Sequence, residues 1–369
     1  MVEISGFASP RHAPVKDAFA ANFAAGEELG ARFTLVEAGE VVVDLWAGFA
    51  DRKRTRAFDE TTLTCVFSVT KILAAVMIAR LVADGRFAYD QPVAAAWPEF
   101  AQAGKAGITV EQALSHQAGL SGFPDQMEPA TWFDWDAICA KLAAMAPLWP
   151  PGTASGYHPI TVGYIVGELF RRVDGRLMGE ALRQDLAGPL GLDLWMGLPD
   201  AEAHRAAELL RPTAPADFGE INTPTRAAFL TPWSAAAGKP QSEWRRLPIP
   251  STNGHATAEA LARLMGRLAD GGGDILPPAG VAELARRRIR GHDLVLPFDL
   301  SWGAGVMRNE TVQFWGPGNA TFGHAGWGGS CAFADPDRRL GGAYVMNRQS
   351  PVLLGDPRAR RLIDAAYAG

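Results

Sequence analysis

Strand patterns lie at both ends of this sequence and helical patterns lie between them, and this arrangement restricts the possible fold more than any other feature. Residues 33–48 (FTLVEAGEVVVDLWAG) contain two apolar, β-branched runs around Ala38-Gly39 and predict a β-hairpin. Residues 330–347 predict two more strands around an Asp335-Pro336-Asp337 turn. A final helix is expected from Asp356-Pro357 onward. We therefore expect one sheet built from both termini, with a helical region inserted between them.

The middle of the chain carries helical periodicity. Apolar residues recur at three- and four-residue spacing in the segments 109–120, 132–146, 161–175 and 257–273. Residues 212–254 are instead rich in Pro, Thr, Ala and Trp without a clear period, and a loop of that length is functional or mobile.

These patterns predict an α+β protein, with an antiparallel sheet flanked by helices and a mainly helical region inserted into it. We assign residues 1–75 and 255–369 to the α/β region. Residues 76–254 form the helical region, and we expect an insert at about 190–250 to line a pocket.

Charge and hydropathy exclude several classes of partner. The net charge is -5 and the sequence pI is about 5.8, so nothing favours nucleic acid. The densest basic run, RRRIR at 286–290, lies in a helical pattern and is expected to be a solvated helix face. No apolar run approaches the roughly 20 residues of a membrane helix, and no secretory signal is visible at the N-terminus.

The cysteines and histidines give no sign of a metal or cofactor. Cys65, Cys139 and Cys331 are odd in number, widely separated and outside any CxxC motif, which is typical of buried thiols in a reducing compartment. The seven histidines show no HxxxH or HxH spacing. We expect a soluble, cytoplasmic protein without a cofactor.

A serine and a lysine lie three residues apart at the start of an apolar helical pattern, in FSVTKIL. The helix is predicted from about residue 68 to a stop at Gly85, and it is apolar all round between Ile72 and Ala79. Ser68 would lie in its first turn with Lys71 on the same side, where burial could lower the pKa of the lysine and make it a base. Chance supplies an S-x-x-K motif about one time in five, and a capping serine beside a solvated lysine is the alternative.

Two further segments could supply partners. In WPPGTASGYHPI, Tyr157 follows a Pro/Gly-rich turn, and a phenol near a lysine could lose its proton more easily and relay one; a core tyrosine is the alternative. In TFGHAGWGGSCAF, the small residues at 324–329 precede a strand and permit backbone N–H groups to face a substrate oxyanion; a β-bulge is the alternative. There is no G-x-S-x-G, Walker, GxGxxG or HExxH motif.

Taken in order, these segments resemble the serine β-lactamase/penicillin-binding-protein superfamily, and within it class C β-lactamases and family VIII carboxylesterases. The resemblance covers nearly the whole chain and includes LSHQAGL and FADPDRRLGGAYVMN. It implies a β-lactamase/transpeptidase-like fold and a serine hydrolase. The positions that match the family's functional blocks are Ser68 (nucleophile), Lys71 (its lysine), Tyr157 (Y-x-N tyrosine), His324, Ala325 and Gly326 (third block), and the backbone N–H groups of Ser68 and Trp327 (oxyanion hole).

Two departures from the lactamase pattern favour an esterase. Pro159 stands where Y-x-N has asparagine, and His324 stands where K-T-G has the lysine that meets the β-lactam carboxylate. The resemblance therefore implies a carboxylesterase of short-chain esters, in which Ser68 attacks and Lys71 with Tyr157 transfers protons. We also expect His324 to bond the tyrosine or a substrate oxygen, and residues 127–135 and 212–254 to line an apolar pocket.

Other functions stay open on the sequence. They include an amide hydrolase of the same fold (a β-lactamase, a D-amino-acid peptidase or a cyclic-amide hydrolase), an acyltransferase, and a catalytically silent binding protein. The expected partner is a small-molecule ester, with no nucleic acid or membrane. The oligomeric state and the natural substrate do not follow from the sequence.

Overall fold

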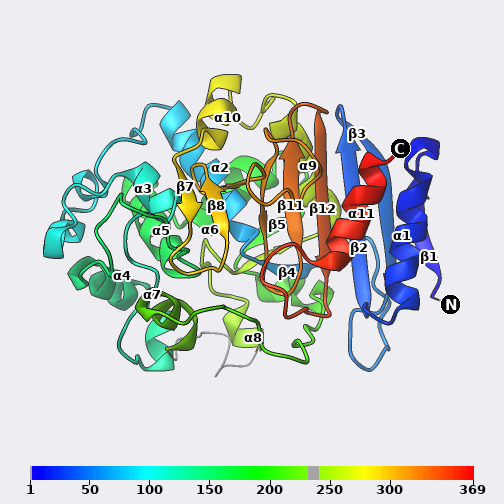
Figure 1. Ribbon diagram of the computed structural model, residues 1–369, viewed down its shortest axis with the longest axis horizontal. Helices are drawn as coiled ribbons and strands as arrows, with labels where there is room; N and C mark the ends of the chain where they lie inside the picture. The colour runs from blue at the N-terminus through cyan, green and yellow to red at the C-terminus, as the bar shows by residue number, and fades with distance from the viewer. Residues whose placement is uncertain (1, 232–240) are drawn as a thin grey trace.

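The computed structural model describes residues 2–231 and 241–369. In this part of the chain nine strands form one antiparallel sheet (Figure 1). In sheet order the strands are β1 (Ile4–Ala8), β3 (Glu40–Gly48), β2 (Gly30–Glu37), β12 (Leu340–Met346), β11 (Cys331–Asp335), β10 (Phe322–Ala325), β9 (Met307–Arg308), β8 (Asp299–Trp302) and β7 (Ile289–His292). Strand β2 pairs with β12 from Ala31↔Met346 to Glu37↔Leu340, so the two ends of the chain meet in the sheet as predicted.

Both predicted hairpins are confirmed. Strands β2 and β3 are joined at Ala38 and Gly39, whose φ values of 50° and 90° lie in the left-handed region that such tight turns require. Strands β11 and β12 are joined by the turn after Asp335. The final helix, α11 (Pro357–Tyr367), begins where Asp356 accepts a hydrogen bond from the Arg358 N–H.

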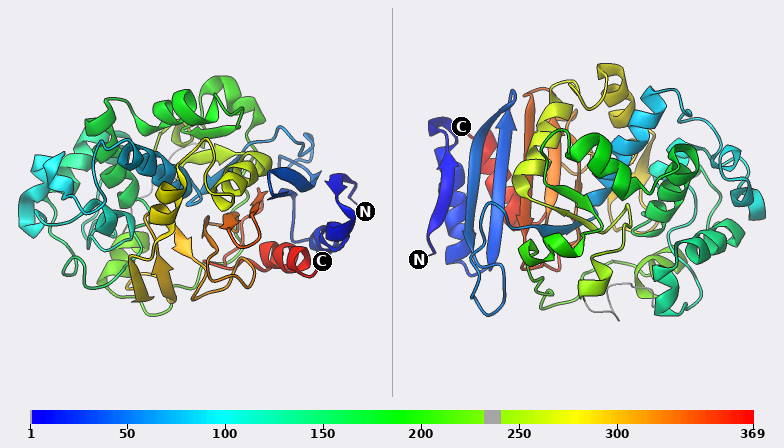
Figure 2. Two further views of the ribbon diagram at one scale, coloured as in Figure 1. Left: turned by 90° about the horizontal axis from the view of Figure 1, so that it is seen from above. Right: turned by 180° about the vertical axis from the view of Figure 1, so that it is seen from behind.

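Helices cover both faces of the sheet (Figure 2). On one face, α1 (Ala13–Ala24) and α11 share an apolar cluster with the sheet residues Phe33, Leu35 and Leu45. On the other face, α9 (Ala258–Ala269) packs with Val36, Ala343 and Val345. Since side chains alternate across a strand, Leu35 and Val36 serve opposite faces. The predicted α+β architecture, an antiparallel sheet flanked by helices, is thus confirmed.

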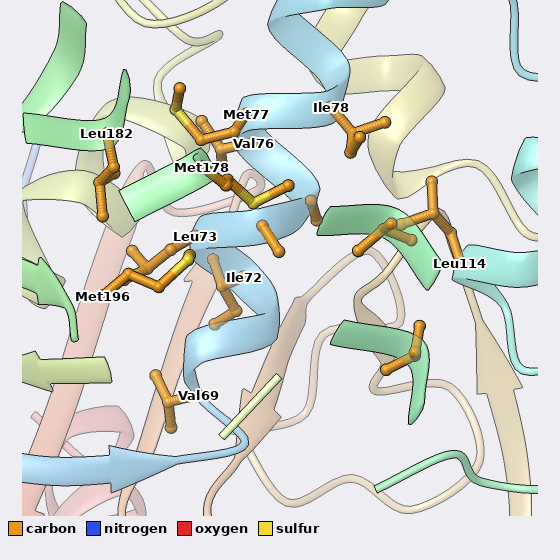
Figure 3. Packing of buried hydrophobic residues seen from close by; sticks show 14 of the residues in the cluster. Val69, Ile72, Leu73, Val76, Met77, Ile78, Leu114, Met178, Leu182 and Met196 are labelled. Atoms are coloured by element: carbon orange, nitrogen blue, oxygen red, sulfur yellow. The ribbon is translucent and has the colours of Figure 1, made fainter. Parts of the chain in front are cut away.

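Helix α2 (Thr70–Ala83) runs through the centre of the molecule, and every residue from Thr70 to Ala79 is buried. Its apolar side chains pack against Leu114, Met178, Leu182 and Met196 (Figure 3). The all-round apolar pattern predicted for this helix therefore reflects burial on every side. Strands β4 (Thr64–Phe67), β6 (Gly254–Ala256) and β5 (Leu194–Met196) form a second sheet, which the sequence did not suggest. Strand β4 leads directly into α2.

The remaining helices follow the predicted periodicity in part. The predicted helix at 161–175 is confirmed, whereas the one at 109–120 stops at Leu114, since His116 and Gly119 adopt left-handed φ values of 63° and 75°. The part of 212–254 that the structure describes holds only short helices, and residues 232–240 lie outside the described chain. The bounds are α3 (Val110–Leu114), α4 (Trp135–Ala144), α5 (Thr161–Asp174), α6 (Met178–Leu182), α7 (Thr223–Thr225), α8 (Gln241–Trp244) and α10 (Pro278–Ala285).

The assignment of the basic run at 286–290 to a helix is wrong. Helix α10 ends at Ala285 and strand β7 begins at Ile289. Arg288 is not on a solvated face either, because its side chain is only 2% exposed, pairs with Glu111 at 2.7 Å and lies over the Tyr89 ring. Arg288 thus links the sheet to the helical region through Glu111, whereas Arg286, Arg287 and Arg290 are exposed to water.

Nothing in the structure tests the division into an α/β region (1–75 with 255–369) and a helical region (76–254), which stays a prediction. Among residues 2–231 and 241–369, no helix combines the length and the apolar character that crossing a membrane requires.

We predict that Gly341→Ala destabilises the fold, since helix α9 lies so close to β12 there that a Cβ on Gly341 would come within 2.1 Å of the Gly266 backbone nitrogen. Overpacking of this kind costs about 1–3 kcal/mol of unfolding free energy, measurable by urea denaturation. Gly280→Ala in α10 is the matched control, because its nearest contact would be an ordinary 3.4 Å. A Gly341→Ala protein as stable as the wild type would contradict this account of the helix–sheet contact.

Candidate active site

Ser68 lies in the turn between β4 and α2, one residue before the helix cap and not within the first turn as predicted. The preceding residue, Phe67, has a φ of 45°, a conformation that costs energy for a bulky side chain. Two hydrogen bonds hold the turn in this shape: the Thr70 hydroxyl donates to the Phe67 carbonyl, and the Gly254 N–H donates to the Thr70 hydroxyl at 2.7 Å. A sharp strand-to-helix turn thus presents the Ser68 hydroxyl at the surface of a cavity.

Lys71 is buried at the start of α2, with its Nζ in contact with three oxygen atoms. Nζ lies 3.0 Å from the Ser68 Oγ, 2.8 Å from the Pro159 carbonyl and 2.9 Å from the Ser251 carbonyl. No carboxylate in the described chain pairs with it, and burial lowers its pKa well below the ordinary value of a lysine. Burial therefore favours the neutral amine of Lys71 over its ammonium form.

The contacts of Lys71 match the hydrogen-bonding capacity of a neutral amine. Two N–H groups meet the carbonyls of Pro159 and Ser251, which can only accept. The one lone pair is left for the Ser68 hydroxyl, which can donate to it. The two carbonyls thereby orient the amine as a base toward Ser68, and Pro159, which departs from the Y-x-N pattern, contributes through its backbone.

Tyr157 completes the contacts of the Ser68 Oγ. Its hydroxyl donates to that oxygen at 2.7 Å, and the Lys71 Nζ lies 4.9 Å from the centre of its ring. The expectation that this phenol loses its proton easily is wrong, because burial raises its pKa above the ordinary value and outweighs the hydrogen bond to Ser68, which lowers it. Tyr157 thus keeps its proton in the resting site and can donate it.

A buried carboxylate that the sequence analysis missed holds Tyr157 in place. Asp293 Oδ1 accepts hydrogen bonds from the N–H groups of Tyr157 (2.8 Å), Val295 (3.0 Å) and Leu296 (3.0 Å). The ring of Tyr157 stacks on Trp302 with centroids 5.8 Å apart. Burial raises the pKa of Asp293, while its three backbone donors favour the ionised form. Asp293 is a positioning residue for the tyrosine.

Three buried histidines surround the lysine and tyrosine without adding charge. Burial lowers the pKa of His158 and of His324 to about 3, and that of His116 well below its ordinary value, so all three are neutral near pH 7. His324 Nδ1 donates to the Ala325 carbonyl at 2.7 Å, and its ring centre lies 5.9 Å from that of Tyr157. The expected hydrogen bond between His324 and Tyr157 is therefore absent from the described contacts.

The segment from Gly326 to Ser330 is held against the turn that carries Ser68. A Cβ on Gly326 would lie 2.2 Å from the Val66 carbonyl oxygen, so only glycine permits this approach. The Ser330 hydroxyl donates to the same carbonyl at 3.2 Å, and the Gly326 N–H donates to the Ser330 carbonyl at 2.7 Å. Neither the Ser68 N–H nor the Trp327 N–H donates to a backbone carbonyl in residues 2–231 and 241–369, so both are available to an oxyanion.

Ser68, Tyr157 and Trp327 open onto one cavity of about 470 Å³. Part of the segment 212–254 lines it, as predicted, together with Leu353 and Leu354. The prediction for residues 127–135 is wrong: none of the side chains described in this range lines the cavity, and Trp132 packs against Phe123 and Tyr164. Most of the wall is apolar: Phe67, Pro159, Ile160, Pro212, Pro215, Ala216, Phe218, Phe229, Trp244, Leu296, Met307, Ala325, Trp327, Leu353 and Leu354.

No group of three or more metal-ligating side chains occurs in the part of the chain that the structure describes. Cys65, Cys139 and Cys331 are buried and unpaired.

The chain is similar to proteins of one family. The Beta-lactamase family model matches residues 15–367. The "Esterase/beta-lactamase LipL" of Mycobacterium tuberculosis is 34% identical over 377 residues, which cover 96% of this chain and 85% of LipL. The crystal structure of a penicillin-binding protein homologue from Caulobacter crescentus is 63% identical with a TM-score of 0.96, and that of a family VIII carboxylesterase is 42% identical with a TM-score of 0.93; each similarity covers 99% of both chains.

We predict that ester hydrolysis reaches its pH plateau far below the ordinary lysine pKa. Because the pKa of Lys71 is lowered, the active neutral amine forms at a lower pH than in an ordinary lysine, and kcat/KM falls only as the pH drops through that lowered value. Ethyl butyrate hydrolysis followed in a pH-stat would show a flat kcat/KM between about pH 8 and 10. A rate that still climbs toward about pH 10.4 would show that Lys71 titrates normally.

We also predict that Asp293→Ala lowers kcat by about 10- to 100-fold, since it releases the backbone of Tyr157 and misplaces its hydroxyl. It also leaves three buried N–H groups without their acceptor. Asp293→Asn retains an acceptor oxygen and should recover most of kcat. Both variants are compared well below their melting temperatures. Full kcat in folded Asp293→Ala would show that Asp293 serves stability alone.

Proposed function

The chain belongs to the beta-lactamase family, and on that premise we propose that it is a serine carboxylesterase that hydrolyses short-chain esters through an acyl-enzyme on Ser68. One observation carries the proposal. The Ser68 Oγ lies within hydrogen-bond distance of both a buried lysine with a lowered pKa and a protonated tyrosine. A nucleophile, a base and an acid therefore meet at one oxygen atom.

In the first half of the proposed reaction, Lys71 takes the Ser68 proton while Oγ bonds to the ester carbonyl carbon. The N–H groups of Ser68 and Trp327 hold the resulting oxyanion. As the carbon–oxygen bond to the alcohol breaks, Tyr157 gives its proton to the leaving oxygen and regains one from the Lys71 ammonium. The serine proton has then moved to the alcohol, and the acyl group remains on Ser68.

In the second half, water attacks the acyl carbon and gives a proton to Lys71, and Ser68 leaves as a hydroxyl after receiving that proton. The products are a carboxylic acid and free enzyme. Water takes the place of the alcohol, so an added alcohol could compete with it, which makes acyl transfer a second outcome of the same site.

An ester substrate is favoured over a β-lactam by the groups around Ser68. His324 is neutral where the family's K-T-G block has a lysine, and Pro159 has no side-chain amide. The cavity is apolar, which suits an acyl or alcohol chain. Amide hydrolysis stays the alternative, since the name of LipL includes both activities and one solved relative is a penicillin-binding protein homologue. The three buried, unpaired cysteines support a reducing, cytoplasmic location.

We predict that Ser68→Ala and Lys71→Ala each lower kcat for p-nitrophenyl butyrate by at least about 1000-fold, since each removes a member of the nucleophile–base pair. Ser5→Ala, on the outer strand β1, is the control and should match the wild type. A fluorophosphonate probe should label the wild type and the Ser5 variant but not Ser68→Ala.

Undiminished turnover by Ser68→Ala would rule out this mechanism. Turnover of nitrocefin or of D-alanyl amides above that of short esters would instead support the amide hydrolase. Wild-type protein that neither turns over an ester or amide nor reacts with the probe would support a silent binding protein.

A further inference from the structure

Among the described residues that line the cavity, only Arg211 has a charged side chain, because His324 is neutral. Arg211 is exposed, and it forms no ion pair with any carboxylate in residues 2–231 and 241–369. Residues 232–240 contain no Asp or Glu, so they cannot supply one. The nearest acid along the chain, Glu208, pairs with Arg52 and accepts a hydrogen bond from the Arg52 N–H, and Asp217 accepts one from the Gly219 N–H. The guanidinium therefore lacks a carboxylate partner within the chain.

The backbone beside Arg211 is fixed relative to the oxyanion turn. The Leu210 N–H donates to the Asn347 carbonyl at 2.8 Å, and the Gln349 N–H donates to the Leu210 carbonyl at 2.9 Å. The Ser350 N–H then donates to the Gly328 carbonyl at 2.9 Å. These backbone hydrogen bonds connect the residue before Arg211 to the turn that carries Trp327 through the segment 347–350. Arg211 thus belongs to the wall beside the oxyanion hole.

The surroundings of Arg211 would strengthen its attraction for an anion. Phe218, Phe229 and Trp327 pack together on the same wall, with ring centres 4.6 to 6.2 Å apart. A charge pair beside an apolar wall is screened less than one in bulk water. A guanidinium also offers two parallel N–H donors that match the two oxygens of a carboxylate.

We propose that Arg211 selects esters whose acyl or alcohol chain ends in a carboxylate several bonds from the ester carbonyl. The inference rests on the proposed function, because Ser68 must attack the ester while Arg211 binds the distant carboxylate. The apolar wall binds the methylene chain between the two groups. This anion site is separate from the third block, because His324 in that block is neutral and cannot form an ion pair with a carboxylate.

The test compares anionic and neutral esters of equal chain length. For the acyl side these are p-nitrophenyl hydrogen glutarate and p-nitrophenyl valerate; for the alcohol side they are 4-acetoxybutanoate and butyl acetate. We expect Arg211→Met to lower kcat/KM about 5- to 20-fold for the anionic member of at least one pair, chiefly through KM. The neutral member should change less than about twofold. Arg211→Lys should retain part of the preference.

Two controls separate recognition from general charge. Arg290→Met removes an exposed arginine of β7 that does not line the cavity, and it should leave both ratios unchanged. The preference of the wild type should also shrink in about 0.5 M salt, because exposed charges are screened.

An Arg211→Met protein whose anionic-to-neutral ratios equal those of the wild type in both pairs would overturn the inference and leave the proposed esterase intact, provided that Ser68→Ala abolishes turnover. Failure of the wild type to hydrolyse any of the four esters would overturn the inference and the proposed function together.

Discussion

The site depends on burial of an amine without a counter-charge. Taking an ammonium out of water is costly unless a carboxylate compensates, and the described chain offers Lys71 only two carbonyls and a hydroxyl. Burial therefore lowers the pKa of the lysine, and in the neutral amine the carbonyls of Pro159 and Ser251 leave the lone pair for Ser68. The same desolvation keeps Tyr157 protonated and the three neighbouring histidines neutral. One physical cause thus sets the protonation of base, acid and surroundings.

The scaffold keeps this arrangement by close backbone contacts. Gly326 lets the oxyanion segment lie against the carbonyl of Val66, and Gly254 donates to the threonine that stabilises the strained turn at Phe67. These contacts join segments from three parts of the chain: β4 with α2, the 251–256 segment, and β10 with the turn after it. A displacement of about 1 Å in any of these segments would misplace the Ser68 oxygen relative to the base, the acid and the oxyanion donors.

Local patterns predicted much of this structure, and long-range contacts account for what they missed. The hairpins and helix α5 follow from turn residues, caps and periodicity, and the motif blocks located Ser68, Lys71 and Tyr157. The carbonyls of Pro159 and Ser251 could not be predicted, because every residue carries a carbonyl and these two lie 88 and 180 positions from Lys71. Asp293 lies 136 positions from Tyr157 and has no motif around it. The pKa of Tyr157 was predicted in the wrong direction because the degree of burial is not visible in a sequence. The helix expected at 286–290 is absent because α10 ends at Ala285 and residues 289–292 pair with β8 as strand β7.

The neutral Lys71 is the central claim, and a direct titration tests it best. The chain has six lysines, so protein labelled with ¹³C at the lysine ε carbon gives few signals, and the one lost in Lys71→Met identifies Lys71. We predict that this signal titrates well below the ordinary lysine pKa of about 10.4 and is that of a neutral amine at pH 7. A Lys71 signal that titrates near 10.4 would contradict the account, because the lysine would then be a cation without a lone pair for Ser68.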